Sequence, residues 1–489
     1  MEARGDTVKL SAATLVDVPA AIPAPRTRGD VGVGIVHFGP GAFHRAHQAA
    51  YIDALLDCDP RWGIAAVSMR SRGTVDALAR QDGLYTLAIR DAAPSFRVIG
   101  AHRRFLGPDE AAQTRALLAD PAVGLVTTTV TEKGYCLAPD GTLDLGHRDI
   151  VHDLAQPDVP ASVIGWIVAG LAARRAAGVS PFVVLPCDNL ASNGAKIRAA
   201  LIAFAHAADA ALADWIAQHV DVRSTMVDSI TPAGDDALTH DVAAALGGLT
   251  DDAAVQREAF TQWVIEDNGR ALGPDLASVG ATLTQDVAGY ERAKLRILNG
   301  AHSTLAYAGL LRGHASVAEA MRDADLAAFV DAMIRRDIAA VLPTVPGLDL
   351  DAYRESVLER FRNPGIVHRL EQIAQDGSQK LPYRLGDTLA ANRVAGRMPR
   401  HVVAALGCWI AFLMARARAG IAIIDPKATR LTEVARDGDP RAVARTLAEE
   451  AIGFLPDLAA DHAAVAAIGD AAAHADASEW KQVFDAACQ

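Results

Sequence analysis

Four polar residues whose types suit the interconversion of an alcohol and a ketone lie in one stretch with helical periodicity: Glu291, Lys294, Asn299 and His302. An α-helix advances about 100° per residue, so these side chains would share a sector of roughly 140°. A lysine whose pKa is lowered by burial can act as a general base. Asn299 and His302 can donate hydrogen bonds to the reacting oxygen. Glu291 either passes a proton to solvent or only forms an ion pair with Lys294, and the whole cluster has a purely structural alternative.

A glycine-containing turn, Gly39-Pro40-Gly41, lies between a predicted strand at 31–38 and a predicted helix at 42–56. Glycines at this spacing let the backbone approach a pyrophosphate, and the following helix offers free N–H groups. The third glycine of the usual dinucleotide fingerprint is replaced by His44. We assign Gly39, Gly41, Phe43 and Arg45 to the cofactor, Arg45 either adding charge at the phosphate or lying on the solvated surface.

The second predicted strand, 64–69, is followed by arginines and not by the acidic residue that usually holds the adenosine ribose. Arg70 or Arg72 could accept a 2′-phosphate, which would favour NADP(H). The alternative is that NAD(H) binds without a carboxylate partner. The sequence therefore predicts NAD(H) as cofactor, with NADP(H) as the alternative, and assigns Arg70 to the cofactor.

Other polar residues follow further predicted strands, where the carboxyl edge of an open sheet binds ligands. Glu132 follows the strand at 124–130 and is assigned to the cofactor. Asn189 follows the apolar run at 182–186 and either binds substrate hydroxyls or the nicotinamide ribose, or shapes a turn. Asp228 ends a further short apolar run and is either a ligand or a carboxylate that caps a helix or shapes a turn. Lys380, in the helical half, either reaches the substrate or lies on the surface.

Strands alternating with helices up to about residue 285 predict an α/β fold with a mostly parallel, doubly wound sheet. Expected strands include 95–105, and expected helices include 164–177 and 196–207. From residue 290 onward, Ala-rich amphipathic helices dominate, for example at 317–327, 405–417 and 442–451. We therefore expect an N-terminal dinucleotide-binding domain at 1–285 and a mainly helical domain at 286–489.

Composition excludes several classes of protein. The chain has 489 residues, with 47 Lys and Arg against 59 Asp and Glu, a formal charge of −12. That surplus argues against a nucleic-acid or membrane-surface partner. Five scattered cysteines without a CxxC pair support neither a disulfide framework nor a metal site, so no metal is expected. The first ten residues are charged and do not resemble a signal peptide. The apolar run 402–415 is too short to span a membrane, so we expect a cytoplasmic protein.

Six segments together resemble the mannitol dehydrogenase family of polyol-specific long-chain dehydrogenases: 35–47 (IVHFGPGAFHRAH), 131–135 (TEKGY), 187–189 (CDN), 226–228 (MVD), 262–267 (QWVIED) and 294–302 (KLRILNGAH). The resemblance implies a Rossmann-type domain, a helical domain and an active site between them. It also implies metal-independent hydride transfer between a nicotinamide and a secondary alcohol of a linear sugar.

The resemblance implies a role for each candidate residue. Lys294 would be the general base, and Asn299 and His302 would bind the reacting oxygen. The other substrate hydroxyls would be held by Asn189, Asp228 and Lys380. A functional monomer is compatible with this family.

Local residues favour a sugar acid, D-mannonate or D-fructuronate, over a neutral polyol such as mannitol or arabinitol. Gln372 lies at a position where mannitol 2-dehydrogenases carry Arg, whereas fructuronate reductases resemble this chain there. We therefore assign Gln372 to the substrate site. Gly269 departs from the aromatic residue expected in fructuronate reductases, so the choice between a sugar acid and a polyol stays open at this position. A substrate carboxylate would need a cation, available from Lys380, Arg384, His368 or Arg369. A catalytically silent nucleotide-binding regulator is the third hypothesis.

Overall fold

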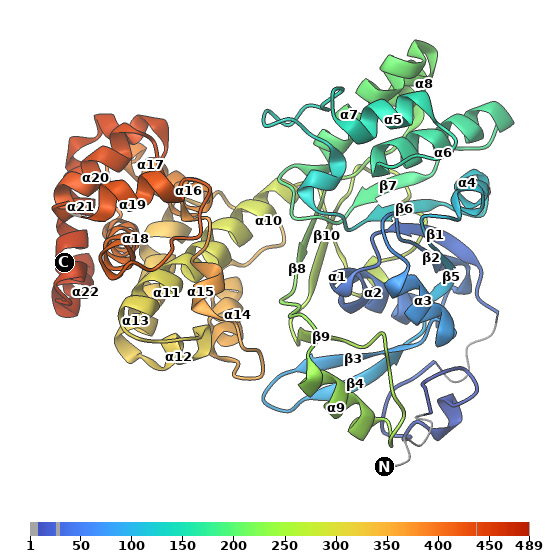
Figure 1. The fold of residues 1–489 in the computed structure, drawn as a ribbon, viewed down its shortest axis with the longest axis horizontal. Coiled ribbons are helices and arrows are strands. Elements are labelled where there is room, and N and C mark those ends of the chain that lie inside the picture. The colour runs from blue at the N-terminus through green and yellow to red at the C-terminus, as the bar shows by residue number, and fades with distance from the viewer. Residues whose placement is uncertain (1–7, 26–29, 437, 489) are drawn as a thin grey trace. The chain divides into compact units, whose positions relative to one another are not determined.

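The computed structural model describes residues 8–25, 30–436 and 438–488 and divides into two compact units, Met1–Val287 and Ala288–Gln489. Figure 1 shows the helices and strands of both units. The sequence-based boundary near residue 285 lies just before the division. The expectation about a signal peptide falls mostly on residues 1–7, outside the described residues.

A parallel five-stranded sheet forms the centre of the first unit, in the order β5-β2-β1-β6-β7. Its strands are β1 (Val33–Phe38), β2 (Gly63–Val67), β5 (His102–Leu106), β6 (Leu125–Thr128) and β7 (Val183–Pro186). In a parallel sheet all the carboxyl ends meet at one edge. That edge therefore gathers the segments that follow β1, β2, β6 and β7.

Successive residues of these strands face opposite sides of the sheet, and each side is covered by helices (Figure 1). Val36 and Val126 pack in one apolar cluster with residues of α4, α6 and α7, whereas Ile35 and Leu125 pack in another with residues of α2 and α3. Because both faces are covered, β2 and β7 are apolar along their whole length, whereas β1 and β6 also contain buried polar residues. The predicted doubly wound α/β sheet is confirmed.

The helices of the first unit are α1 (Ala42–Ala46), α2 (Gln48–Leu55), α3 (Gly73–Arg80), α4 (Ala111–Ala119), α5 (Arg148–Ala155), α6 (Val163–Ala177), α7 (Asn193–Ala208), α8 (Ala210–His219) and α9 (Asp236–Ala245). The predicted continuous helix at 42–56 is wrong, because the chain bends at His47, whose φ is −117° and ψ −90°. The His47 Nε2 lies 2.9 Å from the Gln262 carbonyl oxygen, a contact from a distant strand that holds the bend.

Two three-stranded sheets complete the first unit. One contains β8 (Thr225–Asp228), β10 (Gln262–Glu266) and β11 (Thr282–Thr284), and the other β3 (Tyr85–Arg90), β4 (Ser95–Ile99) and β9 (Val255–Glu258). The single strand expected at 95–105 is therefore two strands in different sheets. β4 pairs antiparallel with β3, and β5 joins the central sheet after a turn at Gly100 and Ala101.

The described part of the second unit is helical. Its α-helices are α10 (Val287–Ala293), α11 (Gly300–Leu311), α12 (Val317–Arg322), α13 (Ala324–Ala332), α14 (Leu350–Arg362), α15 (Leu370–Ile373), α16 (Gly377–Leu381), α17 (Asp387–Val394), α18 (Arg400–Ala419), α19 (Ala428–Arg436), α20 (Pro440–Glu449), α21 (His462–Asp476) and α22 (Trp480–Cys488). The helix expected at 317–327 is two helices, because Asp323 ends α12 and its carboxylate accepts a hydrogen bond from Leu326 N to cap α13.

Helix α18 forms the centre of the second unit and packs against α11, α19, α21 and α22 (Figure 1). By length and composition, α18 is apolar enough to cross a membrane. However, 78% of its apolar window is buried inside the unit, as in a core helix of a folded domain. This agrees with the prediction of a buried helix at 402–415.

Two wide π-helical turns interrupt the helices that carry the candidate residues: Lys294–Asn299 between α10 and α11, and Pro382–Gly386 between α16 and α17. The angular spacing estimated for a regular α-helix is therefore wrong for this stretch, since a π turn closes its hydrogen bonds over one more residue. π turns of this kind occur frequently at functional sites.

Buried histidines lie beneath the glycine turn in the first unit. The His37 ring stacks on the His44 ring with centroids 3.4 Å apart, and His44 Nε2 lies 3.0 Å from His102 Nε2. Burial lowers the pKa of His37 and of His102 to about 3, and that of His44 well below its usual value. All three rings are therefore uncharged near neutral pH.

We predict that His102→Gln reduces the sensitivity of the fold to acid. A histidine whose pKa falls from 6.5 to about 3 on folding contributes stability above pH 6.5 that is lost as the pH falls toward 3. Each such histidine costs ~1.4 kcal/mol per pH unit in that window. Urea unfolding between pH 6 and pH 4 gives the free energy of unfolding at each pH. This free energy should fall less steeply with decreasing pH for His102→Gln than for the exposed control His206→Gln. Equal slopes would contradict the prediction.

Candidate active site

The two glycines of the turn after β1 have different roles. Gly39 has a φ of +90°, and a Cβ placed on it would lie 2.4 Å from the carbonyl oxygen of Thr129, so only glycine fits. A Cβ on the exposed Gly41 would meet nothing closer than the Gly39 carbonyl oxygen at 3.9 Å. Gly39 thus shapes the turn, and Gly41 leaves open space. This open, side-chain-free backbone fits a dinucleotide pyrophosphate.

A hydrogen-bonded network that the sequence analysis missed holds this turn. His37 Nδ1 lies 2.7 Å from Thr127 Oγ1, and its Nε2 lies 2.9 Å from Thr129 Oγ1 and 3.2 Å from the Gly39 carbonyl oxygen. Thr129 Oγ1 also donates to that carbonyl at 2.7 Å. The network ties the end of β1 to the end of β6. A histidine inside an apolar strand was the signal that could have indicated it.

Arg45 is engaged within the first unit. Its guanidinium donates to the carbonyl oxygens of Ala253 and Gly41 and lies over the Tyr85 ring, 5.8 Å from the centroid. Burial lowers its pKa. The guanidinium therefore contributes to the fold, a role that the sequence did not predict. The half-buried Phe43 stacks on His47, with centroids 5.1 Å apart.

The two arginines after β2 differ in their surroundings. Arg72 forms ion pairs with Asp76, Asp109 and Glu110, so its guanidinium is taken up by carboxylates. Arg70 is exposed. Of the two candidates for a 2′-phosphate, Arg70 is therefore the one without such a set of partners among the described residues.

The ends of β6 and β7 are joined by a buried polar cluster. The Asp188 carboxylate accepts hydrogen bonds from the hydroxyls of Tyr135 and Thr128, the latter at 3.0 Å. Burial raises the pKa of Asp188 to about 7. The cluster positions two exposed candidates, Glu132 on the turn before Tyr135 and Asn189 beside Asp188.

Asp228 lies at the end of β8, in a different sheet, and is buried. Asn193, at the start of α7, links the chain after β7 to β8. Its Oδ1 accepts from Thr225 N at 2.9 Å, and its Nδ2 donates to the Thr225 carbonyl oxygen at 3.0 Å. Asn193 thereby holds β8 beside the segment that carries Asn189. The sequence did not indicate this role, because an asparagine at the start of a helix is usually only a cap.

In the second unit, Lys294 and Asn299 begin and end one π-helical turn, and both are half-buried, as is Glu291. His302 lies in the first turn of α11 and is buried, and its Nε2 has no hydrogen-bond partner among the described residues. A buried nitrogen without a partner is costly unless a ligand satisfies it. His302 is therefore suited to bind a substrate oxygen.

Other cations and rings surround His302. Its ring packs on Phe361 and, edge to face, on His368, with centroids 4.4 Å and 4.8 Å away. Burial, followed by the nearby His368, Arg360 and Arg384, lowers the pKa of His302 well below its usual value. His302 is therefore a neutral imidazole in a positive environment.

The two remaining candidates of the second unit lie on short helices. Lys380, at the end of α16, donates to the Gln375 carbonyl oxygen at 2.8 Å and lies 3.6 Å from the Asp376 carboxylate. Burial and Arg384 lower its pKa. Gln372 is exposed on α15, which packs against α11.

Family models match most of the chain. The Mannitol dehydrogenase Rossmann domain matches residues 33–277, and the Mannitol dehydrogenase C-terminal domain matches residues 286–475. The chain belongs to the mannitol dehydrogenase family. This confirms the resemblance and the expected pairing of a Rossmann domain with a helical domain.

Three members of this family illustrate its range. D-mannonate oxidoreductase of Escherichia coli is 40% identical over 80% of this chain and 82% of its own length. Polyol:NADP oxidoreductase of Gluconobacter oxydans is 38% identical over 75% and 78%. The solved mannitol 2-dehydrogenase of Pseudomonas fluorescens, a ternary complex with NAD and D-mannitol, has a TM-score of 0.81 and 35% identity over 98% and 99% of the two chains.

As a mannitol dehydrogenase family member, the protein is an NAD(P)-dependent oxidoreductase that acts on CH–OH groups of polyols or sugar acids. The predicted enzyme class is thereby confirmed. Relatives use either NAD or NADP and either neutral or acidic substrates. The choice between them depends on residues of this chain.

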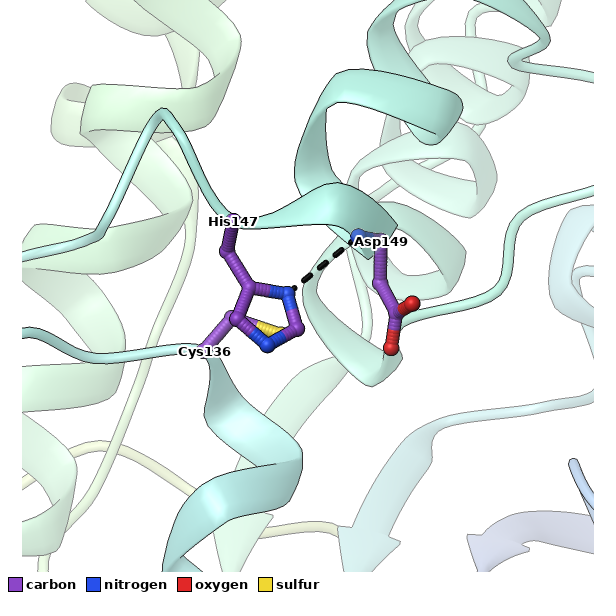
Figure 2. A group of neighbouring side chains, drawn as sticks. All are labelled: Cys136, His147 and Asp149. Atoms are coloured by element: carbon purple, nitrogen blue, oxygen red, sulfur yellow. Dashed lines mark hydrogen bonds between the residues drawn. The ribbon is translucent and has the colours of Figure 1, made fainter.

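One group of possible metal ligands exists in the part of this family member that the structure describes: Cys136, His147 and Asp149, with ligand atoms within 4.8 Å of one another (Figure 2). Their spacing in the sequence is not that of a standard zinc site. His147 Nδ1 already accepts a hydrogen bond from Asp149 N at 3.2 Å and caps α5. Burial raises the pKa of the Cys136 thiol to about 11. The absence of a metal stays a prediction.

We predict that two glycine substitutions in the dinucleotide turn affect different properties, one the stability of the fold and the other the affinity for NADH. Gly39→Ala should destabilise the fold by ~1–3 kcal/mol, because the Cβ meets the Thr129 carbonyl and the backbone is left-handed. Gly41→Ala should leave the melting temperature unchanged but weaken NADH binding by about tenfold, since the methyl group occupies the open space. Thermal unfolding and NADH fluorescence titration measure the two effects. Full cofactor affinity in Gly41→Ala would contradict the assignment.

Proposed function

We propose that this enzyme interconverts D-mannonate and D-fructuronate with NAD(H), NADP(H) being the alternative, and without a metal. The observation that carries the proposal is the environment of His302: a buried Nε2 that finds no hydrogen-bond partner in the described part of the chain, beside the positive charges of Arg360 and Arg384. A substrate with both a reacting oxygen and a carboxylate complements such a site. The 40% identity to a D-mannonate oxidoreductase agrees with it.

The candidate residues of the second unit have distinct chemical roles in the proposal. Lys294 accepts the proton of the substrate hydroxyl as general base, and Glu291 passes it toward solvent. Asn299 donates a hydrogen bond to the reacting oxygen, and neutral His302 donates another from Nε2, which stabilises charge developing on that oxygen. The nicotinamide, when bound, accepts or supplies the hydride.

The remaining candidates bind the two ligands. Gly39, Gly41, Phe43, Arg45, Arg70 and Glu132 serve the cofactor, Arg45 through the fold of the turn. Asn189, Asp228, Gln372 and Lys380 hold the substrate. We place the enzyme in the cytoplasm and expect it to be active as a monomer. Its binding partner is a small sugar acid or polyol, and we expect it to bind neither nucleic acid nor a membrane.

The substrate prediction is tested with purified protein, NADH or NADPH and matched pairs of ketose and keto-acid. We expect loss of nicotinamide absorbance with D-fructuronate and not with D-fructose. Turnover of fructose alone would overturn the sugar acid in favour of a mannitol-type or arabinitol-type dehydrogenase. Cofactor binding without turnover of any substrate would favour the silent regulator.

The lysine mechanism is tested with Lys294→Ala. We expect kcat to fall by about 10²–10⁴, the usual contribution of a general base, with NADH affinity unchanged. The exposed Lys427→Ala serves as the matched control and should keep wild-type rates. Wild-type protein treated with EDTA should also keep its activity. Full activity of Lys294→Ala, or loss of activity in EDTA, would contradict the mechanism.

A further inference from the structure

A guanidinium without a carboxylate partner lies beside His302. Arg384, in the π turn Pro382–Gly386, is half-buried, and its Nη1 donates to Ser303 Oγ at 3.0 Å. Within the described residues, no Asp or Glu oxygen lies within ion-pair distance of it. A partly desolvated charge of this kind is costly unless an anion compensates it.

The other candidate cations are compensated, uncharged or exposed. The Lys380 ammonium lies 3.6 Å from the Asp376 carboxylate. Burial lowers the pKa of His368, so this ring is neutral near pH 7. Arg369 is exposed, where solvent weakens an ion pair. Of these four candidates, Arg384 is thus the half-buried cation for which residues 8–25, 30–436 and 438–488 supply no anionic partner.

The backbone places Arg384 close to the acid–base residues. A Cβ on Gly300 would lie 3.1 Å from the Arg384 carbonyl oxygen, so the turn that ends at Asn299 packs directly on the turn that carries Arg384. The Ser303 hydroxyl, adjacent in sequence to His302, then anchors the guanidinium. Arg384 is therefore held at a fixed position relative to His302 by both backbone and side chain.

We propose that Arg384 binds the carboxylate of the sugar-acid substrate and so selects acids over neutral polyols. The inference rests on the proposed function. A guanidinium presents donors in a planar fork that matches a carboxylate, and one nitrogen held by Ser303 leaves the others for the ligand. A neutral polyol offers hydroxyls to these donors but does not neutralise the charge.

The test compares kcat/KM for D-fructuronate in Arg384→Gln, Arg384→Lys and the exposed control Arg362→Gln. Loss of charge-assisted hydrogen bonds should lower kcat/KM by about 10- to 150-fold in Arg384→Gln, mainly through KM. Arg384→Lys keeps the charge but not the fork and should lie between the wild type and Arg384→Gln. Arg362→Gln should match the wild type. Melting temperatures identify a variant that fails to fold, in which case Arg384→Lys decides.

Two failures can be told apart. Wild-type enzyme that reduces fructose and not fructuronate overturns the proposed function and this inference with it. Wild-type enzyme that reduces fructuronate, together with a folded Arg384→Gln whose KM for fructuronate is unchanged, overturns the inference alone. Equal loss of kcat on fructuronate and on any neutral ketose that is turned over also overturns it, because a carboxylate-binding residue acts selectively on acids.

Discussion

At the end of β1, the backbone of Gly39 passes so close to the Thr129 carbonyl that no side chain fits between them. This close approach brings the ends of β1 and β6 together, and the buried His37 bridges both through hydroxyl and carbonyl oxygens. The open position at Gly41 and the exposed turn that carries Glu132 directly follow these two strand ends in the chain. In the Rossmann unit, buried polar side chains thus fix the conformation of a short stretch of main chain.

The helical unit uses a related device at Gly300. A missing side chain lets two π-helical turns pack backbone to backbone, although 84 positions separate Gly300 from Arg384. Each turn carries residues with assigned chemistry: Lys294 and Asn299 on one, Arg384 on the other. Wide turns expose backbone and side chains that a regular helix would direct elsewhere. The turn that carries the proposed general base, Lys294, and the turn that carries Arg384, proposed to bind the substrate carboxylate, therefore have fixed relative positions.

The sequence predicted what depends on local patterning. The alternation of predicted strands with predicted helices indicated the doubly wound sheet, and the glycine spacing indicated the turn. It did not predict the bend at His47, because the partner of that side chain, Gln262, is 215 positions away. It also placed Lys294 on a regular helix, since nothing in the local sequence marks a π turn. For Arg45 it offered a phosphate contact or a solvated surface position, but not the structural contact with the Ala253 carbonyl, because that partner comes from a distant segment.

Helix α18 shows what this architecture demands of the chain's last segments. The family model ends at residue 475, inside α21, yet α21 and α22 both cover α18. Until these helices are synthesised, α18, which is as apolar as a membrane span, is not fully covered by other helices. The second unit therefore reaches its final packing only after α21 and α22 have been synthesised, and a chain cut short before α21 exposes apolar surface to chaperones and proteases.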